Sequence, residues 1–521
     1  MAATEAGAPA TETAGEPTAL RDRLVSSLPG DKVLGWLGPL LVTAFGAYLR
    51  FNRLAVPRTL IFDETYYAKD AYSLLKFGVE RNPVHNANAL IQSGSTHIFA
   101  SGGEYVVMPP LGKWIIAGGE WLFGLNSFGW RFSAAVFGSL AILLISRITR
   151  RMTRSTLLGC IAGLLMSLDG LEFVMSRTGI LDIFVMFFVL ASFGCLVIDR
   201  DVSRARLARA VAARGTSGGG PGIGIHWWRV AAGFFLGCAC ACKQDAIWYI
   251  VAFAALAVAW DVGARRAAGI THFWRGALVR DAKWLPLTLG VLPLAVYIAS
   301  WTGWFASPDG YDRNYAATVG VHTPLLSPLY SLYEYHVAML QFGVGLSVRH
   351  PYESQPWDWL VLSRPVAYYY SAPTTGAACR VAPHCSQEVL AIGTPAIWWA
   401  SIPALIFCLV WWLLHRDWRA GATVLAVAAG WLTWFPFVSR TKFFYYATEF
   451  EPFLILAIVL CIGLIIGPVR ASVARRSVGA AISGAYLLVV LLNFVYLYPI
   501  LAGKVIPYTS WLSHMWYHGW I

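Results

Sequence analysis

Two adjacent carboxylates, Asp63 and Glu64, stand in the polar stretch Ile61–Asp70 of a chain that is otherwise largely apolar. On a loop that enters a helix, one carboxylate can accept a proton from an attacking hydroxyl while the other orients the acceptor. General-base catalysis of this kind needs a carboxylate within hydrogen-bond reach of the nucleophile. Asp63 can also cap a helix that starts near Thr65, and the two roles are compatible. We therefore predict that the chemistry of this chain centres on Asp63 and Glu64.

Basic side chains recur at the turns between the apolar stretches. Arg131 lies near the start of one such stretch, Lys243 at a turn, and Arg440 before the aromatic run 443–446. A cation at these positions could hold a phosphate as a point charge or as a guanidinium fork. We predict that all three basic side chains contact a phosphate.

Three further charged residues, Arg177, Asp182 and Lys113, can each be interpreted in two ways. Arg177 and Asp182 stand between apolar stretches and could simply pair, since ionisable groups at membrane depth rarely go unpartnered; the same argument makes both functional candidates. Pro109 and Pro110 end a loop and start a helix, because Pro is favoured in the first turn. Lys113 follows them and could contact a substrate or extend its ammonium group to the membrane interface.

The composition indicates the class of fold that positions these residues. Of 521 residues, 57% are hydrophobic, 14% aromatic and 13% charged, whereas soluble domains carry about 25% charged residues. We predict an all-α polytopic membrane protein with about 11 transmembrane helices, judged against the roughly 20 apolar residues that cross hydrocarbon. The predicted spans are 33–47, 127–148, 155–168, 179–198, 230–241, 246–260, 284–304, 394–414, 420–437, 452–466 and 478–498.

The formal net charge of +12 is distributed unevenly. More than half of the 40 Lys and Arg residues fall in six segments, which are 1–32, 147–154, 199–229, 261–283, 415–419 and 469–476. The positive-inside rule places these segments in the cytoplasm. The basic charge is thus an orientation signal toward the lipid bilayer, and no nucleic acid partner is expected. With a cytoplasmic amino terminus, Asp63 follows the first span and faces away from the cytoplasm, and an odd number of spans puts the carboxyl terminus outside as well.

The spans divide the chain into three regions. Residues 1–32, rich in Ala, Thr, Glu, Gly and Pro, should form a disordered cytoplasmic tail. A transmembrane catalytic domain follows over 33–498, and 499–521 form an extracytoplasmic tail. Two outer loops, 54–126 and 305–393, are long, and ordered loops of that length are usually functional.

The outer loops carry two further predictions. The stretches Thr65–Phe77 and Leu111–Phe123 alternate apolar and polar residues at helical spacing, so we predict amphipathic helices that lie in the membrane interface. Cys379 and Cys385 share the second loop in an oxidising compartment, and we predict a structural disulfide between them.

Several of these motifs together carry a family resemblance. They are Phe62–Asp70, Pro109–Lys113, Ser176–Arg177 with Leu181–Asp182, Lys243, and His350–Tyr352 with Ser354 and Pro356. With this pattern the chain resembles the protein O-mannosyltransferase family over most of its length. The resemblance implies an inverting transferase of the GT-C fold that takes mannose from polyprenyl-phosphate-mannose. The acceptors would be Ser or Thr hydroxyls of secreted or membrane proteins, during or after translocation at the translocon.

Roles implied by the resemblance make Asp63 the base, Glu64 its partner, and Lys243 and Arg131 donor contacts. We add Arg177 and Arg440 to the donor or phosphate contacts. Contacts to the acceptor or the loops are predicted for Lys113, Asp182, His350 and Tyr352. The leaving phosphate is weakly basic, so the site needs a base and positive charge, with no cofactor. We expect no metal, because two carboxylates alone make a poor divalent site.

The chain departs from the family at two places. The second outer loop has no room for a β-trefoil insertion, so the chain resembles a short bacterial-type member. The stretch Tyr445–Phe453 replaces a different block of the relatives, which leaves the roles of Glu449 and Glu451 open. Two alternatives remain: another GT-C enzyme that transfers a polyprenyl-phosphate-linked sugar to lipid or glycan, and a lipid-carrier transporter, which would normally show repeated halves.

Overall fold

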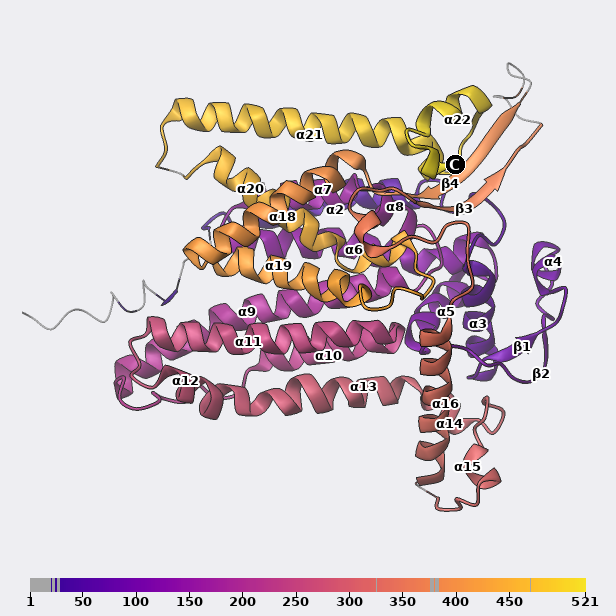
Figure 1. The fold of residues 1–521 in the computed structure, drawn as a ribbon, viewed down its shortest axis with the longest axis horizontal. Coiled ribbons are helices and arrows are strands. Elements are labelled where there is room, and N and C mark those ends of the chain that lie inside the picture. Colours follow the sequence, from indigo (N-terminus) through magenta and orange to yellow (C-terminus); the bar gives the residue numbers. More distant parts are fainter. Residues whose placement is uncertain are drawn as a thin grey trace, which may run out of the picture.

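A computed structural model describes residues 20, 24–25, 29–324, 326–374, 379, 384–468 and 470–521. The predicted disordered tail, residues 1–32, lies almost entirely outside the described residues. In the described part of the chain, long helices lie side by side in one bundle, and shorter helices and strands gather at one end of it (Figure 1).

Seven helices in the described residues are long and apolar enough to cross a membrane. They are α2 (Leu34–Phe51), α6 (Ser127–Thr153), α9 (Asp182–Arg214), α11 (Ile247–Ala267), the continuous run from α12 (Phe273–Gly276) to α13 (Leu292–Ser300), α18 (Pro395–His415) and α21 (Val473–Leu501). Four shorter helices run with them: α7 (Thr156–Ser167), α10 (Trp227–Cys242), α19 (Trp418–Trp431) and α20 (Glu451–Ile466). Every predicted span falls on one of these helices, and the count of about 11 crossings stays a prediction.

Shorter helical segments connect or extend the spans. The α-helices are α4 (Ala87–Gln92), α8 (Gly170–Met175), α14 (Thr302–Ala306), α15 (Tyr315–Thr318), α16 (Leu326–Gly345), α17 (Pro356–Trp359) and α22 (Tyr508–His514). The 3-10 and π segments are η1 (Gln244–Ala246), η2 (Ala277–Asp281), η3 (Ala282–Trp284), η4 (Pro286–Val291), η6 (Leu432–Trp434), η7 (Phe444–Glu449) and η8 (His518–Trp520).

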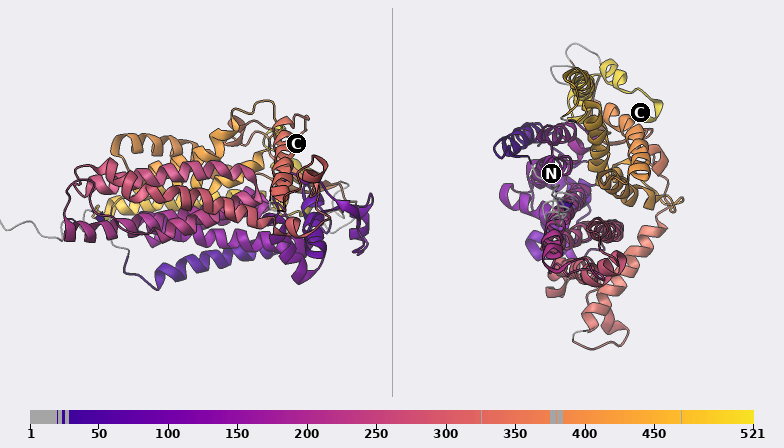
Figure 2. Two further views of the ribbon diagram at one scale, coloured as in Figure 1. Left: turned by 90° about the horizontal axis from the view of Figure 1, so that it is seen from below. Right: turned by 90° about the vertical axis from the view of Figure 1, so that its left-hand side faces the viewer.

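The two predicted amphipathic helices of the first loop are present as α3 (Glu64–Phe77) and α5 (Leu111–Phe123). Gly78 ends α3 in the left-handed conformation, at φ 75°, which a residue without a Cβ adopts at little cost. Both helices lie across the ends of the spans, as does α16 (Figure 1). The first loop is therefore a folded cap on one end of the bundle, also seen in Figure 2.

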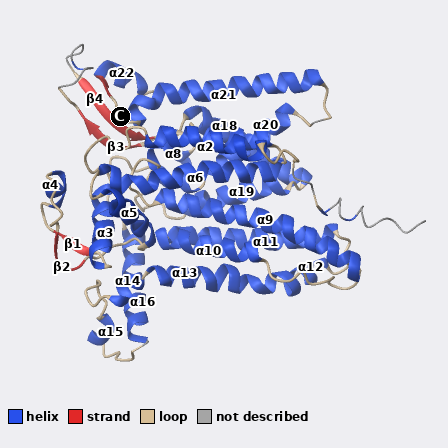
Figure 3. Ribbon diagram, turned by 180° about the vertical axis from the view of Figure 1, so that it is seen from behind, coloured by secondary structure: helices blue, strands red, loops and turns tan. Residues whose placement is uncertain are grey.

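Two small antiparallel sheets lie at this same end (Figure 3). Strand β1 (Arg81–Pro83) pairs with β2 (Phe99–Gly103), and β3 (Val366–Ser371), β4 (Cys385–Ala391) and β5 (Val505–Pro507) form a sheet in that order. The prediction of an all-α chain describes the bundle and omits these strands. Because β5 belongs to the segment 499–521, that segment is a packed part of the capped end.

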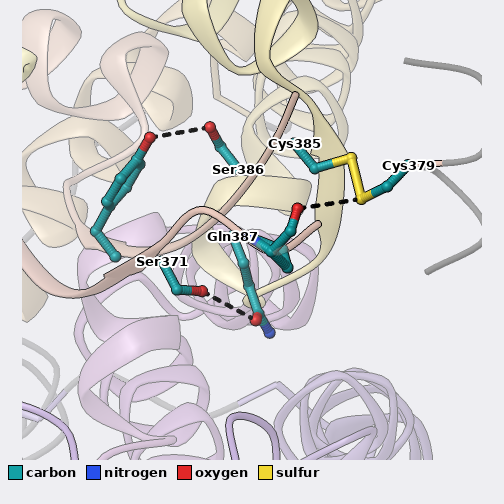
Figure 4. Close-up of a disulfide and its surroundings, with 7 residues drawn as sticks. Ser371, Cys379, Cys385, Ser386 and Gln387 are labelled. Carbon is teal, nitrogen blue, oxygen red and sulfur yellow. Dashed lines mark hydrogen bonds between the residues drawn. A yellow bond between two sulfur atoms is a disulfide. The ribbon is translucent and has the colours of Figure 1, made fainter. Parts of the chain in front are cut away.

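The predicted disulfide between Cys379 and Cys385 is confirmed, and it lies at the start of β4 (Figure 4). Nearby, the Tyr370 hydroxyl on β3 hydrogen-bonds Ser386 on β4 at 3.1 Å. The bridge thus ties Cys379 to the first residue of β4.

Helix α9 is the centre of the bundle, since 89% of its apolar window is buried, against 22% for α2 and for α21.

The two ends of the bundle differ in charge. Helix α6 runs from the capped end to Arg150, Arg151 and Arg154 at the other end. The described basic segments 199–229, 261–283 and 415–419 lie at that end too, opposite the cap that holds α3 and α5 (Figure 1).

Candidate active site

Asp63 lies where the loop after α2 enters α3 and is partly accessible. Its carboxylate makes no capping bond to α3, so the alternative that Asp63 caps this helix is wrong. Instead, the Tyr445 hydroxyl donates to Oδ2 at 3.4 Å. Burial and then Asp182 raise the pKa of Asp63 to about 7, while the Tyr445 hydrogen bond and Lys243 lower it. A carboxylate with this pKa is suited to act as a general base near neutral pH.

Glu64, the next residue, is fully buried and saturated with donors. Arg131 binds it with both ends of its fork, Nε to Oε1 at 2.7 Å and Nη2 to Oε2 at 2.8 Å. The backbone N–H groups of Ile61 and Gly179 donate to the same carboxylate, each at 3.0 Å. Glu64 is therefore a positioning residue that fixes the start of α3 and turns its neighbour toward the site.

Arg131 has no free donor in this arrangement. Its Nη1 donates to the carbonyls of Leu54 and Pro57, and its Nη2 to that of Thr59. Together with the two bonds to Glu64, these use all five N–H groups of a guanidinium. In this arrangement the side chain locks the loop that leads to Asp63 and has no donor left for a phosphate, and the phosphate contact of Arg131 stays a prediction.

Lys243 is buried at the end of α10 and meets three carboxylates. Its Nζ lies 2.8 Å from Asp182, 3.3 Å from Asp245 and 3.8 Å from Glu449. It also sits over the Tyr446 ring, 4.2 Å from the centroid. The predicted site residues Lys243 and Asp182 are thus brought together, and the negative charge of Asp182 raises the pKa of Asp63.

Arg177 caps the carboxyl end of α2, a role that the sequence did not indicate. Its guanidinium donates to four carbonyls at the carboxyl end of α2, those of Leu49, Arg50, Asn52 and Arg53. A cation there satisfies carbonyls without a helical partner and complements the helix dipole. Its predicted pairing with Asp182 does not occur, because Lys243 occupies that carboxylate. The phosphate contact of Arg177 stays a prediction.

Arg440 is partly buried and, like Lys243, lies near the Tyr446 ring. Its guanidinium is 5.8 Å from the Tyr446 centroid and 5.1 Å from that of Trp434, and its Nε donates to the Gly343 carbonyl at 2.6 Å. Tyr446 therefore contacts two cations. Of the four predicted phosphate contacts, Arg440 and Lys243 are the two that the structure places at one aromatic ring beside the Asp63 region.

An aromatic wall stands beside Asp63. The Phe62 ring stacks on Tyr368 at 4.6 Å and meets Tyr445 edge-on at 5.6 Å. Phe443 stacks on Tyr445 at 5.6 Å. The run 443–446 was visible in the sequence as an aromatic cluster, but nothing there indicated Tyr368, which β3 brings in from the second loop.

Two predicted loop contacts lie at the edge of this wall. The His350 ring meets Phe443 edge-on at 5.0 Å and lies 5.8 Å from the Tyr352 ring. Arg364 covers the Tyr352 ring at 5.3 Å. His350 therefore contacts the aromatic wall through Phe443, and Tyr352 lies beside His350.

Lys113 is fully buried between α3 and α5. Its Nζ lies 2.6 Å from Glu80, 4.0 Å from Asp70 and donates to the Met108 carbonyl at 3.0 Å. The alternative that Lys113 extends to the membrane interface is wrong, because its ammonium is held inside the cap. It joins α5 to α3, the helix that carries Asp63 at its start.

No group of three or more His, Cys, Asp or Glu side chains that could hold a metal occurs within the described ranges. The expectation that the reaction needs no metal or cofactor stays a prediction.

Comparison with known proteins now identifies the family. Residues 40–302 match the model for dolichyl-phosphate-mannose-protein mannosyltransferase, and residues 328–520 that for the C-terminal four TMM region of protein-O-mannosyltransferase. A protein of Mycolicibacterium smegmatis (strain MKD8) named polyprenol-phosphate-mannose–protein mannosyltransferase is 39% identical over 508 residues, 94% of each chain. Relatives of the same name from Mycobacterium tuberculosis (strain CDC 1551 / Oshkosh) and Corynebacterium glutamicum are 38% and 33% identical.

The fold agrees with solved structures. The S. cerevisiae protein O-mannosyltransferase Pmt1-Pmt2 complex bound to the sugar donor matches with a TM-score of 0.73 at 14% identity, over 97% of this chain and 94% of that chain. The likeness establishes the GT-C fold, while the sequence matches establish the family. The chain therefore belongs to the protein O-mannosyltransferase family.

Proposed function

We propose that this chain transfers mannose from polyprenyl-phosphate-mannose to Ser or Thr hydroxyls of secreted or membrane proteins, with inversion at the sugar. The observation that carries the proposal is Asp63, a partly accessible carboxylate with a pKa of about 7, beside two cations and an aromatic wall. The names of the relatives favour protein mannosylation over both a different GT-C transferase and a lipid-carrier transporter.

Asp63 supplies the base. Its ionised carboxylate accepts the proton of the acceptor hydroxyl as that oxygen attacks the anomeric carbon of mannose. The bond from this carbon to the phosphate oxygen breaks, and its electron pair leaves with the polyprenyl phosphate. Because the nucleophile enters opposite the leaving group, the configuration inverts. The aromatic wall of Phe62, Tyr368 and Tyr445 offers apolar surface to the sugar ring.

The charge of the departing phosphate is met by the two cations at Tyr446. Preorganised positive charge at the place where negative charge develops lowers the barrier of such a step. Lys243 already has three carboxylates around it. Arg440 has no ion pair among the described residues, so it is the better phosphate contact, and Lys243 mainly sets the charge around Asp182 and Asp63.

The location follows from the distribution of charge. Basic residues gather at the end of the bundle opposite Asp63, and the positive-inside rule assigns that end to the cytoplasm. Asp63 and the carboxyl-terminal residues then face the outside of the cell membrane, where translocating acceptor chains emerge.

The test uses membranes, a mannosyl-phospho-polyprenol donor and a Thr/Pro-rich peptide. Asp63→Asn keeps the size of the side chain and removes the base, so labelling of the peptide should fall by at least about 100-fold, the low end for general-base catalysis. Glu334→Gln, a carboxylate of α16 in the second loop, serves as the matched control and should keep its activity. Undiminished labelling by inserted Asp63→Asn protein would remove Asp63 from the mechanism.

A further inference from the structure

A cavity lies at the far end of the bundle, outside the site described above. Its volume is about 470 Å³, between the end of α6 and the turn from α18 to α19. Arg131 stands in the second turn of α6, and Arg154 directly follows the 27 residues of that helix. A helix of that length spans roughly 40 Å, so this cavity and the Asp63 region lie on opposite faces of the membrane.

Positive charge around this cavity exceeds negative charge. Five arginines and two aspartates form the cluster: Arg151, Arg154, Arg200, Arg416 and Arg419 with Asp201 and Asp417. Asp201 alone meets three of the guanidinium groups, two of them at 2.9 Å and one at 3.4 Å. Within the part of the chain that the structure describes, the five positive and two negative charges leave the cluster with a net excess of three positive charges.

The turn between α18 and α19 leaves one arginine free. Asp417 is fully engaged by Arg419, whose Nη2 lies 2.6 Å from Oδ2. Arg416 is exposed, lines the cavity and makes no ion pair among the described residues. Its guanidinium is available to a ligand.

Aromatic rings and an apolar strip border the basic cluster. Trp418 packs under the guanidinium of Arg200, 3.7 Å away. Along α18, the His415 ring stacks on Trp411 at 3.9 Å and Trp411 on Phe407 at 5.5 Å. The neighbouring Leu414 is 72% exposed. A strip of rings and aliphatic side chains thus runs from the cavity toward the middle of the membrane.

We propose that this cavity binds an anionic phospholipid, with the headgroup phosphate on the arginines and an acyl chain along the α18 strip. Guanidinium groups match phosphate in geometry and charge. Tryptophans favour the level of the headgroups, and basic pockets between helices on the cytoplasmic side suit anionic lipid headgroups. The apolar strip selects a lipid over a soluble phosphate, because only a lipid covers it.

The test measures lipid binding to the purified full chain by native mass spectrometry in detergent. Phosphatidylglycerol should bind at least about tenfold more tightly than phosphatidylcholine, since the latter carries no net charge. Arg416→Gln should weaken phosphatidylglycerol binding by about tenfold, the loss of one charged hydrogen bond. The double variant Arg470→Gln/Arg476→Gln, which removes exposed charges at the same end outside the cavity, should leave binding unchanged.

Three outcomes would overturn the proposal. Equal binding of the two lipids, or equal losses in the cavity and control variants, would show only nonspecific attraction to basic surface. Binding of glycerophosphoglycerol as tight as that of the lipid would make the cavity a soluble-phosphate site. Arg416 is exposed, so its variant should fold; unchanged peptide mannosylation confirms that, independently of the lipid result.

Discussion

Two neighbouring carboxylates have opposite environments in this chain. Glu64 is bound by both arms of the Arg131 fork, whereas Asp63 has a pKa of about 7 because of burial and Asp182. Different environments of this kind give two acids different roles. The sequence indicated the pair but could not assign a role to each acid, because their contacts lie far along the chain: Arg131 is 67 residues from Glu64, and Tyr445 is 382 residues from Asp63. The same reason explains why Arg131 and Arg177 were predicted as phosphate contacts: their carbonyl and carboxylate partners appear only in the folded chain.

The pH dependence of the reaction should report on Asp63. The pKa is raised, so the base is protonated below pH 7 and ionised above it, and kcat/KM for the peptide should rise through about pH 7. Tyr445→Phe removes the hydrogen bond that lowers this pKa, so the midpoint should move to higher pH. Tyr370→Phe, on β3, is the control and should keep the original midpoint. A Tyr445→Phe profile identical to that of the unmodified chain would contradict the role of the hydrogen bond.

Replacing Arg131 distinguishes positioning from phosphate binding. Arg131→Gln leaves Glu64 buried without its partner, and breaking such a pair costs about 3–5 kcal/mol. Thermal unfolding in detergent should therefore show a large loss of stability, and Glu64→Gln/Arg131→Gln should lose less than the sum of the single changes. If Arg131 contacted only the donor, the unfolding temperature would stay the same and the donor KM would rise.

At the scale of elements, local pattern predicted helices well and strands poorly. The helices α3 and α5 begin and end within one residue of the predicted ranges, because their apolar residues repeat along the chain. The three-stranded sheet could not be predicted in this way. Its strand β5 has three residues, and its partner β4 lies in another loop. Tyr368, which completes the aromatic wall, was missed for the same reason.

The disulfide at β4 offers a test of this end of the molecule. Cys379 and Cys385 should resist maleimide labelling in denatured, unreduced protein, and reduction should add two labels by mass. The free cysteine Cys408 labels in both conditions after denaturation and serves as the internal reference. Full labelling without reduction would show that this end does not meet an oxidising compartment.

For the whole molecule, the grouping of basic residues at one end of the bundle was predictable, because the charged residues between the spans can be read directly from the sequence. The described basic segments 147–154, 199–229, 261–283 and 415–419 lie at one end, and α3, α5 and α16 lie across the other (Figure 1). What could not be predicted is that the capped end is folded, since its helices and strands come from three separate stretches of sequence.

Single cysteines should confirm the orientation in intact cells. Ser93→Cys, beside α4, should react with a membrane-impermeant maleimide. Val473→Cys, which is 82% exposed at the start of α21, should react only after the cells are opened. The reverse pattern would place Asp63 in the cytoplasm and contradict the proposed site of reaction.

The pairing of β4 with β5 also imposes an order on biosynthesis. The Gln387 side chain bonds the Gly503 carbonyl across 116 positions of sequence, and the helices α18, α19, α20 and α21 lie between them. The ribosome must translate these four helices before β4 can find its neighbour. A nascent chain halted before β5 would carry an open edge on β4, and the capped end of the enzyme is completed only after β5 has been translated.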